Sequence, residues 1–519
     1  MSSRALPALV LVLLSGCPGG GGSVGDSCSN ASDCDGPLQC VEHVCAPRCQ
    51  RAPECGDGYA CDADGLCRAA TGEVGDACES EVECGSGLSC QIDGTTATGS
   101  GKLPTSCSAQ YPGRPAGSEC SVDTQCRNGT CALGHCVDLC TDTRDCGSGD
   151  ACMSIPRIEA NGVMFRGCLP ARGTIEWTIP VIGPRSDILF PIPDAARSAL
   201  LVFRVDDVAQ KVGALRVDEP NGDPLAPIYK KPCHRSSPTD TTCDDVVAIE
   251  QYFAQSVRHL PEAGQSELLL PSTPSTPLIP GAYKVKVSSF RANDSAGSAI
   301  PRVTAVLKMD SAVTLDLHFY FLDLDDHPCD AAFGSRRLDA AAAKDATFFQ
   351  SDFVGELRTV FSGGGLAIGA TTYQDLTDHP DLDGLTIDDA GALLSLGAHE
   401  TGINVFFVRT LSPVGLQAFG PNPGPAGVAG TRQSGVIISV DTLCYRSWSQ
   451  LARLTAHELS RYMGLYHNVE LEVAQHPSWR DPIDDSDASS RNLMFFSELG
   501  GIELSPGQRE ILSKSAVLR

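Results

Sequence analysis

A chain of 519 residues is long enough to form several domains, and its apolar fraction of 42% excludes a disordered protein. Its formal net charge of −25 argues against nucleic acid as a partner, because no basic surface is available to displace phosphate counterions. The sequence also lacks a P-loop and a dinucleotide-binding fingerprint, so no nucleotide partner is expected. A solvated acidic surface accounts for the charge without any particular ligand.

The N-terminal residues 1–16 are predicted to be a lipoprotein signal peptide. Arg4 precedes an apolar run at 5–14, which is too short for a helix across a bilayer core about 30 Å thick. Leu14-Ser-Gly-Cys17 resembles a bacterial lipobox, which implies cleavage before Cys17 and its lipidation. The alternative is an ordinary signal peptide with a chance cysteine. Residues 17–27 are rich in glycine and are expected to form a flexible tether.

The lipobox resemblance implies a bacterial cell-envelope protein that is held on a membrane by its lipid. Position 18 is Pro rather than the Asp that, in the enteric sorting rule, retains lipoproteins in the inner membrane. By that analogy we expect an outer-membrane location.

Cysteine spacing defines the next region, residues 28–168. The 24 cysteines left after Cys17 suggest disulfides and an oxidising compartment. Twenty of them form five units of four, and each unit opens with C-x5-C. Such units are too small to bury a core, so two disulfides per unit are expected to hold each one. Four cysteines allow three pairings, among which the sequence does not choose. Zinc knuckles are disfavoured because no C-x2-C pair occurs.

These units resemble the Cys-rich repeats of Dickkopf-like regions and of bacterial surface lipoproteins. That resemblance implies a stalk or a module that binds a protein partner.

Residues 172–310 are predicted to form an antiparallel β-sandwich, an accessory domain of jelly-roll type. Apolar and other residues alternate around Ile175, Trp177 and Ile179, as in half-buried strands. The continuous apolar run 199–203 fits a strand that is covered on both faces. Cys233 and Cys243 are close enough to close one loop.

The C-terminal residues 311–519 alternate strand and helix patterns, which indicates an α/β domain. Strands are expected at 313–321, 366–370, 403–411 and 435–440, and helices at 339–361 and 388–396. Cys329 and Cys444 remain once the local pairs are assigned and are expected to bond to each other.

A later helix carries the chemistry. His457 and Glu458 are followed by Gly464 and His467, and the intervening position 461, one helical turn after His457, is Arg. Two His at i and i+4 on one helix face bind zinc, and the adjacent Glu serves as general base toward a zinc-bound water. A Gly in left-handed conformation then ends the helix and turns the chain, so that a third His reaches the metal. The alternative is a core helix that contains two His by chance and binds no metal.

This pattern resembles the H-E-x-x-H-x-x-G-x-x-H motif of the metzincin zinc metalloproteases. Asn492-Leu-Met494-Phe-Phe496 resembles their Met-turn, and the later 504–508 brings the sequence closest to the pappalysin-like branch. The resemblance covers about residues 311–519. It implies a zinc site with His457 and His467 as ligands and Glu458 as the catalytic base.

Arg461 occupies the position of the second zinc-binding His. Arginine offers no lone pair and stays protonated, so zinc binding is expected to be weak or absent. An ion pair with Glu458 would also consume the base. We therefore expect a pseudoprotease with a binding or scaffold role. The alternative is an active zinc metalloendopeptidase that cleaves envelope or extracellular proteins with a substitute third ligand. The candidates for that ligand, by proximity in sequence, are Glu470, His476, Asp484 and Asp485.

Overall fold

The structure is a computed structural model that describes residues 26–519 with internal gaps. The gaps are 36–37, 42, 56–58, 62–64, 100, 227–256, 258, 260, 294, 323, 326, 335–336, 380–381, 383, 400, 414, 422–428, 470–479 and 498–500. Predictions for Cys17, the signal peptide, the Cys233–Cys243 pair, Glu470 and His476 therefore lie outside the described residues. Within the described residues, no helix has the length and apolarity needed to cross a bilayer.

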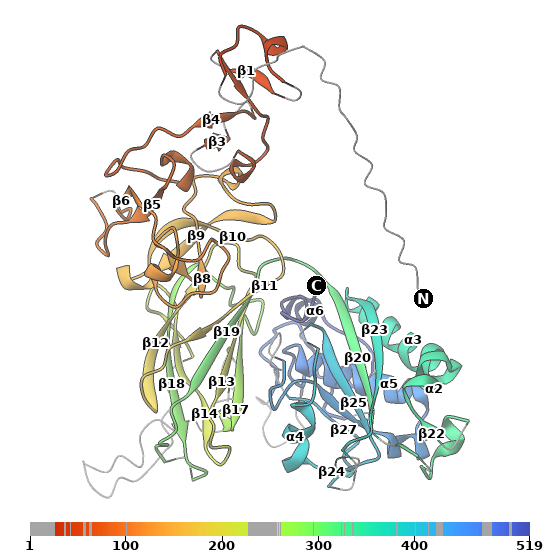
Figure 1. Ribbon diagram of the computed structural model, residues 1–519. Helices are drawn as coiled ribbons and strands as arrows, with labels where there is room; N and C mark the ends of the chain where they lie inside the picture. Colours follow the sequence, from red (N-terminus) through yellow and green to blue (C-terminus); the bar gives the residue numbers. More distant parts are fainter. Residues whose placement is uncertain are drawn as a thin grey trace, which may run out of the picture.

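The N-terminal region, red to orange in Figure 1, is rich in disulfides, as predicted. In every unit the first cysteine bonds to the third and the second bonds to the fourth. The pairs are Cys28–Cys40, Cys34–Cys45, Cys49–Cys61, Cys55–Cys67, Cys78–Cys90, Cys84–Cys107, Cys120–Cys131, Cys126–Cys136, Cys140–Cys152 and Cys146–Cys168. The pairing that the sequence left open is thus the same throughout.

Each unit is a short 3-10 turn followed by a hairpin. The turns are η1 (Ala31–Asp33), η2 (Ala52–Glu54), η3 (Glu81–Glu83), η4 (Asp123–Gln125) and η5 (Thr143–Asp145). The hairpins are β1 (Gln39–Val41) with β2 (Val44–Ala46), β3 (Tyr59–Cys61) with β4 (Cys67–Ala69), β5 (Leu88–Ile92) with β6 (Thr105–Ala109), β7 (Cys131–Ala132) with β8 (His135–Cys136), and β9 (Asp150–Arg157) with β10 (Val163–Pro170). The third and fourth cysteines face each other across every hairpin, and each bonds to a different cysteine upstream.

Each of the five units also has a polar residue directly before its second cysteine. Its side chain accepts a hydrogen bond from the backbone N–H of the residue after the first cysteine, at 2.7–3.1 Å in the five units. The acceptors are Asp33, Glu54, Glu83, Gln125 and Asp145. This contact closes the C-x5-C loop, and it is a repeat signal that our sequence analysis missed.

Two antiparallel sheets follow, as expected for the β-sandwich. One has the order β11 (Thr174–Ile179), β19 (Arg302–Lys308), β13 (Ser198–Arg204), β17 (Gln265–Leu270). The other has the order β12 (Arg185–Ile192), β18 (Gly281–Phe290), β14 (Lys211–Asp218), β15 (Pro224–Ala226), with β16 (Glu262–Ala263) also paired to β14. Apolar side chains from both sheets form one buried cluster.

Strand β13 is covered on both faces, as its apolar run predicts. Ala199, Leu201 and Phe203 belong to the core between the two sheets. Leu200 and Val202 instead belong to the core of the C-terminal region. Because successive side chains of a strand point to opposite faces, β13 separates two cores that both pack against it.

The C-terminal region contains a mixed sheet of order β23 (Ala367–Leu376), β20 (Thr314–Leu322), β25 (Ile403–Val408), β28 (Val436–Ser439), β27 (Ala418–Phe419). The first four strands are parallel, and the edge strand β27 is antiparallel to β28. One face packs with α2 (Ala340–Asp345), the π-helix η9 (Phe348–Val354), α3 (Gly355–Gly363) and α5 (Trp448–Tyr462). The other face packs with α4 (Ala390–Leu394), so strands and helices form layers (Figure 1).

Smaller elements complete the described part. They are η6 (Ile158–Ala160), β21 (Leu324–Asp325) paired with β22 (Arg337–Leu338), η8 (Asp330–Ala332), β24 (Gly384–Thr386) paired with β26 (Thr410–Ser412), η11 (Ile387–Asp389), η12 (Val440–Cys444) and α6 (Pro506–Ser513).

The expected helix 339–361 is interrupted. The backbone of Ala346 is extended, with φ −77° and ψ 136°, and separates α2 from η9. Gln350 stabilises the break because its side-chain N–H donates to the carbonyl of Ala343 at 2.7 Å. The expected strand 403–411 is likewise divided between β25 and β26.

Two connections join distant parts of the chain. Cys329 and Cys444 form the expected disulfide. The buried Lys308 of β19 donates through Nζ to the carbonyl of Leu518 at 2.9 Å. With the shared core at β13, this bond fixes the C-terminus against the β-sandwich.

Candidate functional site

Helix α5 positions the first half of the candidate site. Ser447 and Gln450 cap its N-terminus reciprocally, each side chain accepting from the other's backbone N–H. The helix is buried along most of its length, and His457 and Glu458 are each 6% exposed. A buried polar pair on a core helix is costly unless both side chains have partners, and the contacts below supply them.

Gly464 ends this helix and redirects the chain. Its φ is +111°, which favours glycine, and the N–H of Leu465 donates back to the carbonyl of Ser460 at 3.0 Å. A Cβ at this position would also lie 2.4 Å from Cδ2 of Leu269, in strand β17. The turn therefore needs glycine for conformation and for contact with the β-sandwich, and it brings His467 back toward the helix.

The two histidines meet as the motif predicts. Their Nε2 atoms are 3.2 Å apart. The opposite nitrogen of His457, Nδ1, lies 2.8 Å from the carbonyl of Leu493, so Nδ1–H donates and Nε2 keeps its lone pair toward His467. Burial, followed by the neighbouring His467 and Arg461, lowers the pKa of His457 to about 3. His457 is therefore neutral.

Half of this geometry fits a zinc ion. Two imidazole nitrogens bound at about 2.05 Å in a tetrahedral site lie about 3.3 Å apart, close to the separation seen here. The Nδ1–H bond of His457 to a backbone carbonyl is also typical of zinc-bound histidine. However, the next ligand position along the helix is a guanidinium, so the residues do not provide the three histidines that the motif requires.

Arg461 pairs with Glu458. Its Nη1 lies 3.5 Å from Oε2 of Glu458, and the two side chains are 29% and 8% exposed. Burial raises the pKa of Glu458 above its ordinary value, and the charges of Arg461 and His467 and a backbone hydrogen bond with Gly420 offset this only in part. A Cβ on Gly420, just after the edge strand β27, would lie 2.8 Å from Oε2 of Glu458.

Arg461 also acts on the β-sandwich. Desolvation raises the pKa of Glu262 in β16, and the positive charge of Arg461 lowers it. Because Glu262 is exposed at the surface, water screens much of this interaction. Arg461 therefore pairs with a buried carboxylate of its own helix and, more weakly, attracts an exposed one of the neighbouring sheet.

The loop with the predicted Met-turn lies against both histidine-bearing segments. His457 donates to the carbonyl of Leu493, and the N–H of Asn468, next to His467, donates to the carbonyl of Met494 at 2.9 Å. The Met494 side chain is fully buried. The structure thus brings His457, Glu458, Arg461, His467 and Met494 into one place.

A buried amide network that the sequence analysis missed holds this loop. Asn492 accepts from the N–H of Met494 at 2.8 Å and donates to Gln508 Oε1 at 2.9 Å. Gln508 also donates to Asp481 at 3.2 Å. Gln508 is the third residue of α6 and forms a capping box with Ser505, a spacing that can be found in sequence.

Two of the four candidate substitute ligands, Asp484 and Asp485, lie within the described residues, and the structure shows no contact of either with the histidine pair. Asp485 accepts from Ser505 Oγ at 2.7 Å and from the N–H of Gly507 at 2.9 Å, so it caps α6. Asp484 is exposed on the same loop. Glu470 and His476 lie outside the described residues.

No family model matches this chain, and no curated protein matches it. A solved structure of the Gt strain of infectious bursal disease virus is similar over 28% of this chain, at 15% identity and a TM-score of 0.13. The match covers 34% of that viral chain. A likeness this weak gives no basis for assigning a fold or a function.

Proposed function

We propose that the protein is a lipid-anchored envelope protein whose C-terminal region is a metzincin-like pseudoprotease with a binding or scaffold role. The observation that carries this proposal is the ion pair of Arg461 with Glu458, at 3.5 Å. It puts a permanent cation at a ligand position and occupies the carboxylate that the metzincin resemblance assigns as general base.

Electrostatics favours keeping this pair. The Glu458 carboxylate is buried, and a buried charge that loses its partner costs several kcal/mol, on the order of 3–5. A zinc ion held by His457 and His467 would stand beside the guanidinium, and the two positive charges would repel each other. Arg461 therefore supplies, within the chain, the positive charge that a metal would otherwise bring to Glu458.

The remaining parts fit an anchored binding protein. In this proposal Cys17 carries the lipid, residues 17–27 are the tether, and 28–168 are the stalk or protein-binding module. Residues 172–310 are the accessory domain and 311–519 the metzincin-like domain. The expected partners are a membrane, through the lipid, and another protein, and we propose an outer-membrane location.

Zinc binding tests the pseudoprotease. Purified protein is expected to bind zinc weakly in calorimetry and to leave a casein substrate uncut. Arg461→His supplies a third imidazole on the helix, and zinc affinity should rise by at least about 10- to 100-fold, since changes outside the ligand set alone have effects of that size. Arg453→His is the matched control, because Arg453 lies on the same helix, is 44% exposed and pairs with Glu356. It should leave zinc affinity unchanged.

The active endopeptidase is the second candidate, favoured by the 3.2 Å separation of the two Nε2 atoms. Stoichiometric zinc in the unmodified protein, lost in His457→Ala together with casein cleavage, would establish it in place of the pseudoprotease. A third ligand would then have to come from elsewhere in the chain.

The lipid anchor has its own test. Cys17→Ala should accumulate as an unprocessed precursor and should fail to incorporate a clickable palmitate analogue in growing cells. Membrane fractionation gives the opposing outcome. If the Cys17→Ala variant is processed and sediments with the membranes as the unmodified protein does, the lipobox interpretation is wrong.

A further inference from the structure

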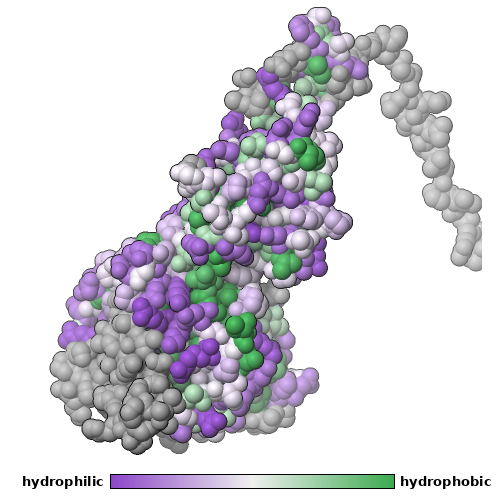
Figure 2. Space-filling view, turned by 90° about the vertical axis from the view of Figure 1, so that its left-hand side faces the viewer, coloured by the Kyte–Doolittle hydropathy of each residue, from purple (hydrophilic) through white to green (hydrophobic). Residues whose placement is uncertain are grey.

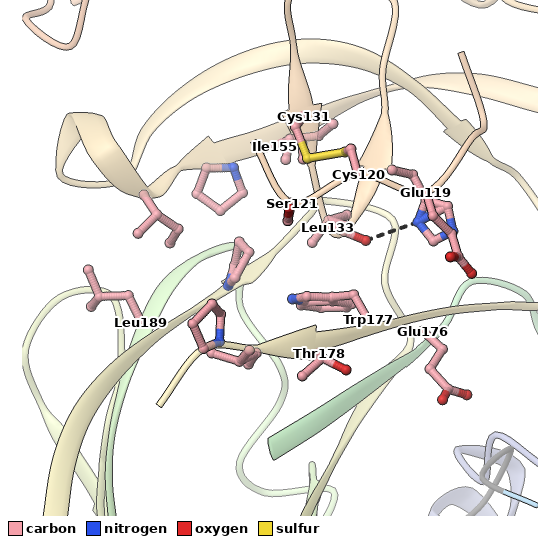
Figure 3. A pocket seen from close by; sticks show the side chains of 18 of the residues that line it. Glu119, Cys120, Ser121, Cys131, Leu133, Ile155, Glu176, Trp177, Thr178 and Leu189 are labelled. Carbon is pink, nitrogen blue, oxygen red and sulfur yellow. Dashed lines mark hydrogen bonds between the residues drawn. A yellow bond between two sulfur atoms is a disulfide. The ribbon is translucent and has the colours of Figure 1, made fainter. Parts of the chain in front are cut away.

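A cavity of about 940 Å³ lies between the Cys-rich repeats and the β-sandwich, away from the histidine pair (Figure 3). Strand β9 and the Cys120–Cys131 disulfide form one wall, and strands β11 and β12 form the other. Figure 2 shows apolar surface where the repeats meet the body of the molecule. One wall is cross-linked, and the strands of the other are each paired within a sheet of the β-sandwich, β11 with β19 and β12 with β18. The cavity is therefore preformed.

Trp177 forms the floor of the cavity. It is half-buried, and its ring stacks on Phe190 with the centroids 6.0 Å apart. A Cβ on Gly134 would lie 2.4 Å from Cβ of Trp177, so the repeats contact this residue directly. The nitrogen end of the indole points toward the open middle of the cavity (Figure 3). Trp177 thus offers an apolar face and a hydrogen-bond donor.

The rest of the wall combines apolar and polar side chains. Leu133 and Ile155 are buried behind it, and Leu189, 40% exposed, stands at the end opposite the acidic side chains (Figure 3). The lining also includes three prolines, Pro156, Pro180 and Pro191, and polar side chains such as Ser121, His135 and Thr178.

Carboxylates mark the other end. Glu119 and Glu176 are both exposed and lie on the same side of Trp177 (Figure 3). Arg157 also lines the cavity, but it is ion-paired with Asp123 and, at 3.0 Å, with Glu159. This cation is therefore matched by two carboxylates of the repeats.

We propose that this cavity binds an extended basic segment of a protein partner. A lysine or arginine side chain has an apolar stem that packs on Trp177, and a charged end that reaches Glu119 and Glu176. Backbone carbonyls of the segment can accept from the Trp177 N–H. This inference names where the binding role resides, and it depends on neither the zinc motif nor Arg461.

The test uses the mature full-length chain and fluorescein-labelled (Pro-Lys)5, an extended peptide that loses little entropy on binding. Fluorescence anisotropy should show binding that weakens as salt is added, and none to (Pro-Glu)5. Glu119→Gln combined with Glu176→Gln should lower the affinity about tenfold, because each close pair of a peptide lysine with a glutamate adds to the binding free energy. The matched control combines Glu73→Gln with Glu510→Gln, two exposed positions elsewhere, and should change affinity less than about twofold.

Trp177→Ala should lower the affinity about tenfold as well, and Trp177→Phe should retain most of it because an aromatic face remains. Thermal unfolding of each variant separates a loss of binding from a loss of structure. If the Trp177→Ala chain does not fold, the Trp177→Phe and glutamate variants test the proposal instead. Equal affinity of all variants, or an equal loss of affinity in the Glu73/Glu510 control, would overturn the proposal. The overall negative charge of the protein would then account for the binding. Failure here leaves the zinc and casein results unaffected, so the two proposals fail separately.

Discussion

The Cys-rich repeats and the C-terminal sheet are fixed by opposite means. Ten disulfides hold the repeats, where strands have two to eight residues. The buried cluster of the first unit consists of cysteines, whereas the last units add apolar side chains to the core of the β-sandwich. In the described part of the C-terminal region there is one disulfide, and order comes from a large apolar core. Covalent links lower the entropy of the unfolded chain, whereas a core lowers the free energy of the folded one. The fold of the repeats therefore depends on oxidised cysteines more than the fold of the C-terminal region does.

Reduction is expected to have the largest effect and to separate the two regions. Each repeat disulfide spans 10–23 residues and contributes about 3 kcal/mol, so dithiothreitol should unfold the repeats. Trypsin digestion after reduction and alkylation should degrade them first and leave a fragment from the sheets. A Cys329→Ser/Cys444→Ser chain, treated in the same way, controls for the C-terminal bond. Equal digestion rates in both regions would contradict the comparison.

Removing a ring from the C-terminal core should be next in size. Phe349 is fully buried, and its ring centroid lies 4.9 Å from that of Phe353 and 5.3 Å from that of Phe319. Phe349→Ala should lower the free energy of unfolding by about 3–5 kcal/mol in urea titration. Tyr111→Ala, at an exposed aromatic of the repeats, should change it by less than about 0.5 kcal/mol. Similar losses for both would mean that the repeats have an apolar core after all.

Sequence patterns predicted these two regions unequally well. The cysteine spacing defined five units, but the pairing within each unit depends on which side chains a hairpin brings together, and spacing does not contain that. The apolar run of β13 predicted its double burial correctly. The break at Ala346 was missed, because the helical spacing of Phe349 and Phe353 continues across it.

At the candidate site, local spacing was informative and long-range contact was not. The turn at Gly464 and the meeting of His457 with His467 follow from the motif. The contact of Gly464 with Leu269, and the approach of Gly420 to Glu458, join segments 195 and 38 residues apart (464 − 269 and 458 − 420). No local pattern encodes such pairs. The cavity beneath Trp177 was missed for the same reason, since its walls come from separate regions.

The β-sandwich contains a buried histidine that makes its stability depend on pH. His259 is buried, with Nδ1–H donating to the carbonyl of Glu267 at 2.7 Å and Nε2 accepting from the N–H of Ala214 at 2.8 Å. Burial lowers its pKa from 6.5 to about 4. The unfolded state then binds the proton more tightly, so stability is complete above pH 6.5 and falls as the pH drops toward 4, by about 3 kcal/mol.

Urea titrations between pH 7 and 4 check this sign. His259→Gln keeps a neutral polar side chain and should lose this component of the pH dependence, although its stability at pH 7 will be lower. Subtracting the two curves cancels the other titrating groups. A difference that stays constant across the window would show that His259 is not held neutral by the fold.

The smallest expected effect concerns the Met494 loop, which hydrogen bonds hold in place of a disulfide. Asn492 is 4% exposed and Gln508 fully buried, and each satisfies the other. Asn492→Ala leaves the N–H of Met494 and the amide of Gln508 short of partners, so we expect a loss of about 1–3 kcal/mol in urea titration. Asn221→Ala removes an exposed loop amide that bonds to Asp223 and should cost less than about 0.5 kcal/mol. Because Leu493, the acceptor for His457, lies in this loop, Asn492→Ala should also weaken zinc binding in an Arg461→His chain by about tenfold or more. Lost stability with unchanged zinc affinity would mean that His457 is oriented by its helix alone, and the loop would then support the fold without supporting the site.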